Sequence, residues 1–279
     1  MRVGIIGGTG VYGIKGGTLA QRRIYRIYFR QVGFLGAGDL TDAVFLARHG
    51  PEHNVPPHMI NYRANLMALY QLGVQRIMAT FAVGSLKLSL PPGSMVALDQ
   101  FIDFAHSRQG TFFDGGCYGL AHTDMTYPYC PVLRERLLSL AADRRLAIQP
   151  RGTYVAFNGP RLETAAEIRM CAQLGGDVVG MTGVPEAQLA RELGMHYAAV
   201  ATSINYAAGL KGPTMIDKSG LDENRAVLLS LFVETLRAPF QGPCRCAESV
   251  RMKHPPTAWK WRTTGQEAGA NKDTSTLDV

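Results

Sequence analysis

Several of the apolar runs that read as buried strands are followed at once by groups that bind anions. Because the carboxyl ends of parallel strands meet at one edge of an open α/β sheet, these groups are expected to lie together. Hydroxyls, an arginine, a histidine and free backbone N–H groups form a cradle for an oxyanion such as phosphate. The residues are Thr9, Arg48, His49, Phe81, Ala82 and Thr182.

A second pair of strand-end residues suits a different ligand group. Glu163 follows the strand expected at 153–157, and Asn205 follows the strand expected at 197–204. A carboxylate acceptor beside an amide donor can read the edge of a polar heterocycle. Each residue also has a purely structural reading, in which Asn205 caps its strand and Glu163 faces solvent or begins a helix as a first-turn carboxylate. Likewise, Arg48 alone would fit an ion pair with a surface carboxylate.

The elements that must position these residues alternate between strand and helix. Helical spacing of apolar residues spans 61–72, 164–174 and 185–193, and each run stops at a glycine. This alternation predicts one α/β domain over residues 1–239, with a mainly parallel mixed sheet covered by helices on both faces. The strands are expected at 3–6, 43–47, 76–80, 95–98, 153–157, 178–181 and 197–204.

A glycine pattern after the first strand offers an alternative function. Gly8–Gly13 fits G-x-G-x-x-G, the turn that binds the pyrophosphate of a nicotinamide cofactor. That motif needs a helix directly after the glycines and an acidic residue about 20 positions further on. Gly16 and Gly17 interrupt such a helix, and the next acidic residue is Asp39. We therefore favour a phosphate-binding turn over a dehydrogenase.

The amino-acid composition narrows the structural class of the protein and its expected cellular compartment. Charged residues are 18% of the 279 residues and glycines number 31, which is typical of a glycine-rich buried sheet rather than a coiled coil or a disordered chain. The net charge of +7 is diffuse, so no nucleic-acid partner is expected. No apolar run is long enough for a signal peptide or a membrane span, and the five cysteines are dispersed, which predicts a cytoplasmic protein without a disulfide framework.

The last forty residues differ in character from the rest. Residues 240–279 lack periodicity and are interpreted as a partly disordered appendage of unknown role. Trp259 and Trp261 are expected to pack on the domain or on a neighbouring subunit, with nucleic-acid binding as the less favoured alternative. Cys244 and Cys246 read as two ordinary thiols, with a strained bridge or a weak metal site as the alternatives. No set of His, Cys and carboxylate residues has the spacing of metal ligands along the chain, so no metal is expected.

Six separated motifs occur in order along residues 3–235, and they are Gly4–Gly10, Leu46–Gly50, Asn61–Asn65, Asp99–Asp103, Gly159–Arg161 and Gly180–Glu186. Together they resemble the trimeric purine nucleoside phosphorylase and methylthioadenosine phosphorylase family. The resemblance implies a nucleoside phosphorylase fold, a homotrimer, no cofactor, and attack of inorganic phosphate on C1′ of a purine nucleoside. The products would be free purine and a ribose 1-phosphate, as in purine salvage.

Site roles follow from the resemblance position by position. Thr9, Arg48, His49, Ala82 and Thr182 would hold phosphate, with Phe81 at a position where relatives carry Thr or Asn, so that its backbone would serve. The remaining residues would bind the nucleoside, with Met181 under the ribose, Leu162 where relatives often place Phe, and His122 lent to the neighbouring subunit's pocket. These residues are Leu162, Glu163, Met181, Asn205, Tyr206, Ala207 and His122.

The residue at position 205 distinguishes the branches of this family. The methylthioadenosine branch places Asp-x-Asp after the last core strand, whereas this chain has Asn205-Tyr206-Ala207. A 6-oxopurine presents O6 as acceptor and N1–H as donor, which suits an Asn donor and the Glu163 acceptor. The sequence therefore favours the 6-oxopurine branch, with inosine, guanosine or S-methyl-5'-thioinosine as substrate and Asn205, Glu163 and His49 as catalytic residues. A methylthioadenosine phosphorylase and, because of Phe81, an inactive nucleoside-binding protein are the alternatives.

Overall fold

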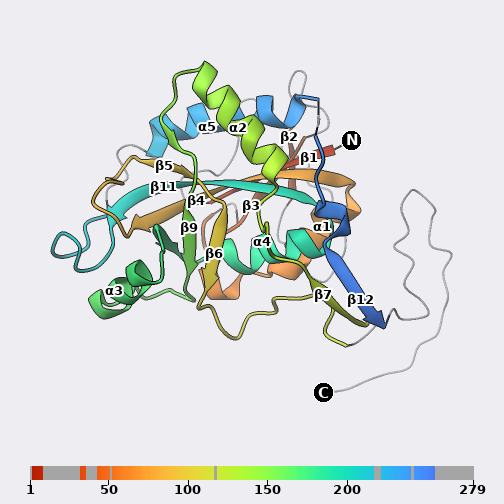
Figure 1. The fold of residues 1–279 in the computed structure, drawn as a ribbon, viewed down its shortest axis with the longest axis horizontal. Helices are drawn as coiled ribbons and strands as arrows, with labels where there is room; N and C mark the ends of the chain where they lie inside the picture. The colour runs from red at the N-terminus through yellow and green to blue at the C-terminus, as the bar shows by residue number, and fades with distance from the viewer. Residues whose placement is uncertain are drawn as a thin grey trace.

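The computed structural model describes residues 2–8, 32–35, 43–50, 52–115, 118–216, 221–239 and 242–254. Within this part of the chain, ten strands form one curled sheet (Figure 1). They are β1 (Arg2–Gly7), β2 (Val32–Leu35), β3 (Ala43–Ala47), β4 (Val74–Ser85), β5 (Met95–Ala97), β6 (Gln100–Asp103), β8 (Ile148–Gln149), β9 (Thr153–Ala156), β10 (Val178–Gly180) and β11 (His196–Tyr206). A separate two-stranded sheet pairs β7 (Leu120–Thr123) with β12 (Val250–His254).

Strand β4 organises the main sheet. It runs parallel to β1 in its first half and parallel to β11 along most of its length, and near its end it pairs antiparallel with β10. Further parallel pairs join β1 to β3, β9 to β10 and β6 to β9. The predicted α/β class with a mainly parallel mixed sheet is confirmed. All seven strands expected from the sequence are present, with ends shifted by a few residues.

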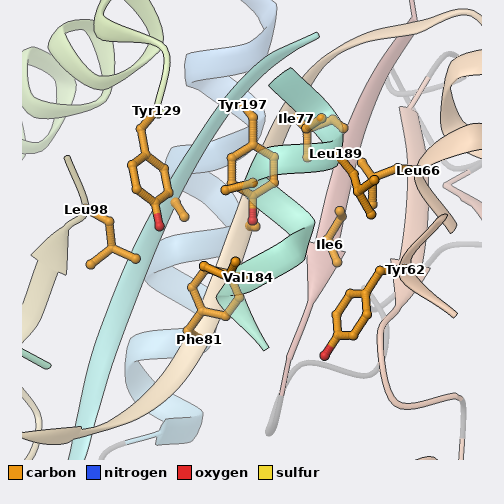
Figure 2. Close-up of a cluster of buried hydrophobic side chains, with 14 of the residues drawn as sticks. Ile6, Tyr62, Leu66, Ile77, Phe81, Leu98, Tyr129, Val184, Leu189 and Tyr197 are labelled. Atoms are coloured by element: carbon orange, nitrogen blue, oxygen red, sulfur yellow. The ribbon is translucent and has the colours of Figure 1, made fainter. Parts of the chain in front are cut away.

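Helices cover both faces of the sheet. On one face, Leu66 of α1 (Tyr62–Gln71) and Leu189 of α4 (Gly183–Glu192) belong to one apolar cluster with Ile6, Ile77 and Tyr197 (Figure 2). On the opposite face, α2 (Pro131–Asp143) and α5 (Leu221–Arg237) pack in a second cluster. Helix α3 (Ala165–Gln173) packs in a third, smaller cluster beside β9 and β10. Burial on both faces explains why the strands read as continuous apolar runs.

Local capping agrees with the predicted helix starts. The Asn61 side chain accepts from the Ala64 N–H at 2.9 Å and caps α1. Thr164 and Glu167 form a reciprocal capping box that starts α3. Helix α4 begins two residues before the expected Pro185, and Val184 inside it has the non-helical angles φ −123° and ψ 132°. Among the described helices, α2 and α5 were not predicted.

The C-terminal segment contacts the domain as far as residue 254. Strand β12 pairs antiparallel with β7, and the 3-10 helix η2 (Cys246–Glu248) lies against the turn at Gly194, where an added Cβ would be 3.2 Å from the Ala247 Cα. The domain boundary at residue 239 stays a prediction. Trp259 and Trp261 lie outside the described residues. None of the helices described here combines the length and the apolar character that a membrane crossing requires.

Candidate active site

One pocket opens at the carboxyl ends of β1, β3, β4, β10 and β11, where the sequence places its polar residues. Because these strands run side by side, residues far apart in the chain line the same wall. Most of the predicted site residues are among them. The pocket is lined by Arg48, His49, Phe81, Ala82, Leu162, Glu163, Met181, Thr182, Asn205 and Ala207.

Three predicted residues do not line this pocket or are not described. Thr9 lies outside the described residues, although its neighbour Gly8 lines the pocket. Tyr206 follows Asn205, and its hydroxyl donates to the Leu88 carbonyl at 3.3 Å. His122 is exposed on β7, away from the pocket lining. Its predicted contribution to a neighbouring subunit stays a prediction.

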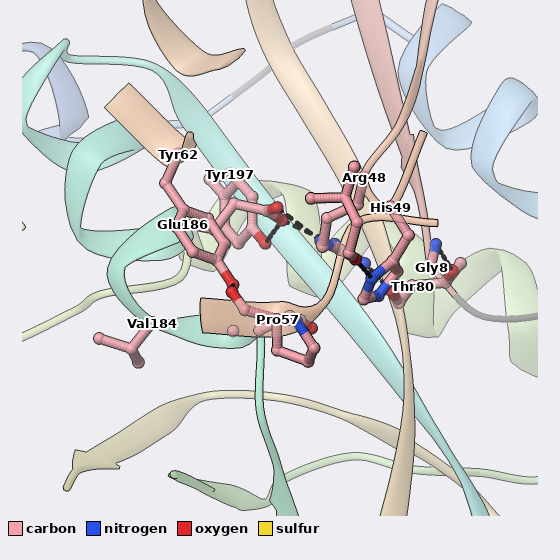
Figure 3. A network of polar contacts seen from close by, with 12 residues as sticks. Gly8, Arg48, His49, Pro57, Tyr62, Thr80, Val184, Glu186 and Tyr197 are labelled. Atoms are coloured by element: carbon pink, nitrogen blue, oxygen red, sulfur yellow. Dashed lines mark hydrogen bonds and ion pairs between the residues drawn. The ribbon is translucent and has the colours of Figure 1, made fainter. Parts of the chain in front are cut away.

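Arg48 is held by a buried carboxylate that was not assigned a role from the sequence. Its Nε and Nη2 donate to the two oxygens of Glu186 at 2.6 and 2.7 Å, and Nη1 donates to the Thr80 carbonyl at 2.9 Å (Figure 3). The Tyr197 hydroxyl also donates to Glu186, at 2.7 Å. Burial acts to lower the pKa of Arg48, but the charge and hydrogen bonds of Glu186 raise it above its ordinary value. The partner of Arg48 is therefore a buried carboxylate, not a surface one.

Close packing fixes the orientation of this guanidinium. A Cβ added at Gly8 would lie 2.7 Å from the Arg48 Nη1 and 2.8 Å from the Thr80 carbonyl oxygen, so only glycine fits there. The Gly8 N–H donates to the Thr80 hydroxyl at 3.2 Å. On the other side, the Phe81 ring centroid is 4.4 Å from the guanidinium carbon. Phe81 therefore contributes an aromatic face that holds Arg48, in addition to its backbone.

His49 is neutral and its tautomer is set by a backbone carbonyl. Its Nδ1 is 2.9 Å from the Val55 carbonyl oxygen, so Nδ1 carries the proton and Nε2 is an acceptor. Burial is the main cause that lowers the pKa of His49 to about 4, and the charges of Arg48 and His53 act in the same direction. A neutral Nε2 can accept a hydrogen bond from a protonated oxygen of phosphate.

Glu163 is a buried carboxylate with one unsatisfied oxygen. Its Oε1 has no hydrogen-bond partner among the described residues, although the side chain lines the pocket. Burial is the main cause that raises the pKa of Glu163 above its ordinary value. Glu163 precedes the cap residue Thr164, and the first-turn carboxylate of α3 is Glu167. The alternative reading of Glu163 as a solvent-facing or first-turn residue is therefore wrong.

A β-bulge places Asn205 in the pocket wall. The register between β11 and β4 shifts between Ser203 and Asn205, and a bulge of this kind re-aims the side chains that follow it. The Asn205 Nδ2 lies 3.1 Å from the position of a Cβ added at Gly84, so the amide packs over a glycine. Nδ2 donates to the Tyr206 carbonyl at 2.9 Å. An amide nitrogen carries two hydrogens, so this bond leaves one for a ligand.

Tyr154 is a second positioning residue that the sequence reasoning did not identify. Its buried hydroxyl accepts hydrogen bonds from the Thr182 N–H at 3.0 Å and the Gly183 N–H at 3.2 Å, at the start of α4. These bonds fix the pocket residue Thr182 and the helix that carries Glu186. A polar residue inside a buried apolar strand is the signal that could have identified Tyr154.

Comparisons with known proteins agree with this fold. The 6-oxopurine nucleoside phosphorylase of Pyrococcus furiosus is 51% identical over 259 residues, which cover 90% of this chain and 98% of that protein. The S-methyl-5'-thioadenosine phosphorylase of Pyrococcus horikoshii is 39% identical over 258 residues, with the same coverage of 90% and 98%. A solved structure of a mutant adenosine/methylthioadenosine phosphorylase from Schistosoma mansoni, in complex with methylthioadenosine, superposes with a TM-score of 0.74 and is 31% identical, covering 85% of this chain and 93% of that one.

The model of one protein family spans nearly the whole described domain. It matches residues 2–237, which include every strand of the ten-stranded sheet and the five described α-helices. The dehydrogenase reading of Gly8–Gly13 is therefore not retained. The family match, the fold and the relatives together show that this chain belongs to the phosphorylase superfamily.

Proposed function

We propose that this chain is a purine nucleoside phosphorylase that acts on 6-oxopurine nucleosides, with inorganic phosphate as co-substrate and no further cofactor. The relative at 51% identity is named 6-oxopurine nucleoside phosphorylase, and relatives at 43–50% identity are named probable 6-oxopurine nucleoside phosphorylases. The relatives named S-methyl-5'-thioadenosine phosphorylase are 39% identical. The products would be a free purine base and a ribose 1-phosphate, in purine salvage.

The observation that carries this proposal is the unsatisfied Oε1 of Glu163 in the pocket wall. A buried carboxylate oxygen without a partner costs free energy, and a ligand that donates a hydrogen bond removes that cost. The N1–H of hypoxanthine or guanine is such a donor, while N1 of adenine is an acceptor. Glu163 therefore favours a 6-oxopurine over a 6-aminopurine.

Asn205 complements this acceptor on the purine edge. The hydrogen of Nδ2 that the Tyr206 carbonyl does not use can donate to O6 or N7 of the base. Negative charge develops on these purine atoms as the glycosidic bond breaks, so a donor placed there stabilises the transition state more than the ground state. Preorganised donors of this type contribute roughly 10²–10³ in rate.

The phosphate would bind on the opposite side of C1′. Arg48, His49 and Thr182 line the pocket together with Phe81 and Ala82, and with Thr9 they are proposed to hold the phosphate. The dianion and the departing base then flank a ribose that gains positive charge. Glu186 fixes the Arg48 guanidinium by two hydrogen bonds, so little reorganisation is needed when phosphate binds.

A phosphate-dependent assay with four nucleosides tests the proposal. Inosine, guanosine, S-methyl-5'-thioinosine and S-methyl-5'-thioadenosine are compared side by side, and the same reactions without phosphate serve as blanks. We expect the three 6-oxopurine nucleosides to release base only when phosphate is present. A kcat/KM that is highest for methylthioadenosine would instead assign the chain to the function of the 39% identical relatives. Tight base binding without product release would identify an inactive binding protein.

The oligomeric state is part of the same proposal. We expect a homotrimer in which His122 of one subunit reaches the 5′ end of a nucleoside bound to the next, because His122 is exposed on β7 and does not line the pocket of its own chain. Light scattering gives the subunit number. His122→Ala should raise KM for nucleosides and leave the oligomer intact, and an unchanged KM would contradict this role.

A further inference from the structure

Four metal-binding side chains that are distant in the sequence meet at the end of the domain opposite the pocket. Cys130 lies at the start of α2, His196 is the first residue of β11, and Cys244 and Cys246 belong to the C-terminal segment. Their three sulfur atoms and one imidazole nitrogen all lie within 4.8 Å of one another. The sequence analysis treated Cys244 and Cys246 as ordinary thiols because their spacing does not reveal the other two members.

We propose that Cys130, His196, Cys244 and Cys246 form a structural zinc site. Three cysteines and one histidine are an established donor set for tetrahedral Zn²⁺. Bond lengths of about 2.3 Å to sulfur and about 2.0–2.1 Å to nitrogen require ligand atoms separated by about 3.8 Å for two sulfurs and about 3.5 Å for sulfur and nitrogen.

The separations within the cluster fit this requirement. Cys130 and Cys244 Sγ are 3.6 Å apart, and the His196 Nδ1 is 3.6 Å from Cys130 Sγ and 3.3 Å from Cys244 Sγ. Cys244 and Cys246 Sγ are closer, at 2.9 Å. A metal between them would separate this pair by about 1 Å, which rotation about the side-chain bonds can supply.

The surroundings of the cluster suit a bound metal with three thiolates. Zinc, three thiolates and a neutral imidazole carry a net charge of −1. The buried Arg191 donates from Nη1 to Cys246 Sγ at 3.2 Å and supplies the compensating positive charge. The Ser249 hydroxyl donates to the Arg191 carbonyl at 2.9 Å, so a hydrogen-bonded shell supports the arginine.

The position of the cluster indicates a structural role. His196 and Asn205 lie at opposite ends of β11, and nine residues of strand span about 30 Å, so the cluster is remote from the pocket. All four coordination positions come from protein side chains, which leaves no open position for catalysis. A metal would join the C-terminal segment to α2 and β11, and so fix β12 against β7.

The metal content of the full chain tests this site directly. Protein purified with a thiol reductant and without chelator is analysed by elemental mass spectrometry and by intact native mass. We expect about one zinc per chain, lost in Cys246→Ser and in His196→Ala. Cys171→Ala removes a buried cysteine outside the cluster and should keep the zinc. Wild-type protein stripped by a chelator should have a lower Tm and recover it when zinc is added, while kcat for nucleoside cleavage stays the same.

Cobalt titration keeps the test decisive if the variants fail to fold. Co²⁺ added to stripped wild-type protein should produce the visible bands of tetrahedral thiolate coordination, and zinc should abolish them. The proposal is overturned by metal-free protein that gives no cobalt bands. It is also overturned by an intact mass lower by two hydrogen atoms under native conditions, which would show that two of these thiols form a disulfide instead.

Discussion

Replacement of Glu163 by glutamine separates a ligand-binding role from a structural one. The two side chains have the same shape, but the amide lacks the charge that burial disfavours at this position. A hydrogen bond to a charged partner contributes about 1.5–3 kcal/mol and a neutral one about 1 kcal/mol, so the difference is about 0.5–2 kcal/mol. We therefore expect Glu163→Gln to lower kcat/KM for inosine roughly 2- to 30-fold.

Stability should change in the opposite direction. Burial raises the pKa of Glu163, so the charged form costs stability in the folded protein, and that cost disappears as the pH falls through the raised pKa. At neutral pH the glutamine variant avoids this cost, and its Tm should be equal to or higher than that of the wild type. A residue with a purely structural role would lose stability instead.

The pH profile and the substrate preference supply two further readouts. The acid limb of kcat/KM for inosine should fall at a pH above the ordinary glutamate pKa in the wild type and disappear in Glu163→Gln. The kcat/KM of the variant for adenosine should also rise relative to that for inosine, because its amide can donate to N1 of adenine. Glu167→Gln is the matched control, since Glu167 pairs with Arg161 outside the pocket. An unchanged kcat/KM for inosine in Glu163→Gln would refute the assignment of this carboxylate to the base.

Four other substitutions test the remaining parts of the pocket. Because the pKa of His49 is lowered to about 4, the folded protein binds fewer protons than the unfolded chain between pH 4 and the ordinary pKa of 6.5, and stability falls with decreasing pH across this range. His49→Gln should remove about 3 kcal/mol of that pH dependence, measured by urea titrations at several pH values. Glu186→Gln leaves the buried Arg48 uncompensated and should cost about 3–5 kcal/mol of unfolding free energy, so a loss under about 1 kcal/mol would contradict the ion-pair argument. Gly8→Ala should cost about 1–3 kcal/mol and raise KM for phosphate, since its methyl group displaces the guanidinium; an unchanged KM would separate Arg48 from phosphate binding. Asn205→Asp should shift the ratio of kcat/KM values toward 6-aminopurine nucleosides by about tenfold or more, because a carboxylate repels O6, and an unmoved ratio would remove Asn205 from base recognition.

The part of the site that was predictable from the sequence depends on one topological rule. Buried strands are recognisable as apolar runs, and parallel strands deliver the residues after them to a common edge. That rule alone brings Arg48, Glu163 and Asn205 together, although more than 150 residues separate the first from the last. The family resemblance then added the roles of individual residues.

The interactions between site residues were beyond the reach of the sequence. Glu186 reads as an ordinary first-turn helix carboxylate, and only the packing of α4 against the sheet brings it to Arg48. The bulge that directs Asn205 depends on pairing with β4, which no local pattern encodes. The proposed zinc ligands were equally hard to predict from the sequence. Cys130 and Cys246 are far apart in the chain, and only the packing of the helices and strands brings them close together.

Two buried carboxylates, Glu163 in the pocket wall and Glu186 behind the pocket residue Arg48, differ in whether their oxygens have partners. Both oxygens of Glu186 are satisfied, by Arg48 and by Tyr197, whereas Oε1 of Glu163 has no partner among the described residues. An unsatisfied buried carboxylate oxygen is destabilising, so a carboxylate with a purely structural role is expected to have partners for both of its oxygens. The cost at Glu163 is retained where a ligand can remove it, whereas Glu186 prepares the arginine before any ligand arrives. Because differences in environment separate the roles of two acids, we expect Glu163 to be the carboxylate that contacts substrate and Glu186 to be the one that positions Arg48.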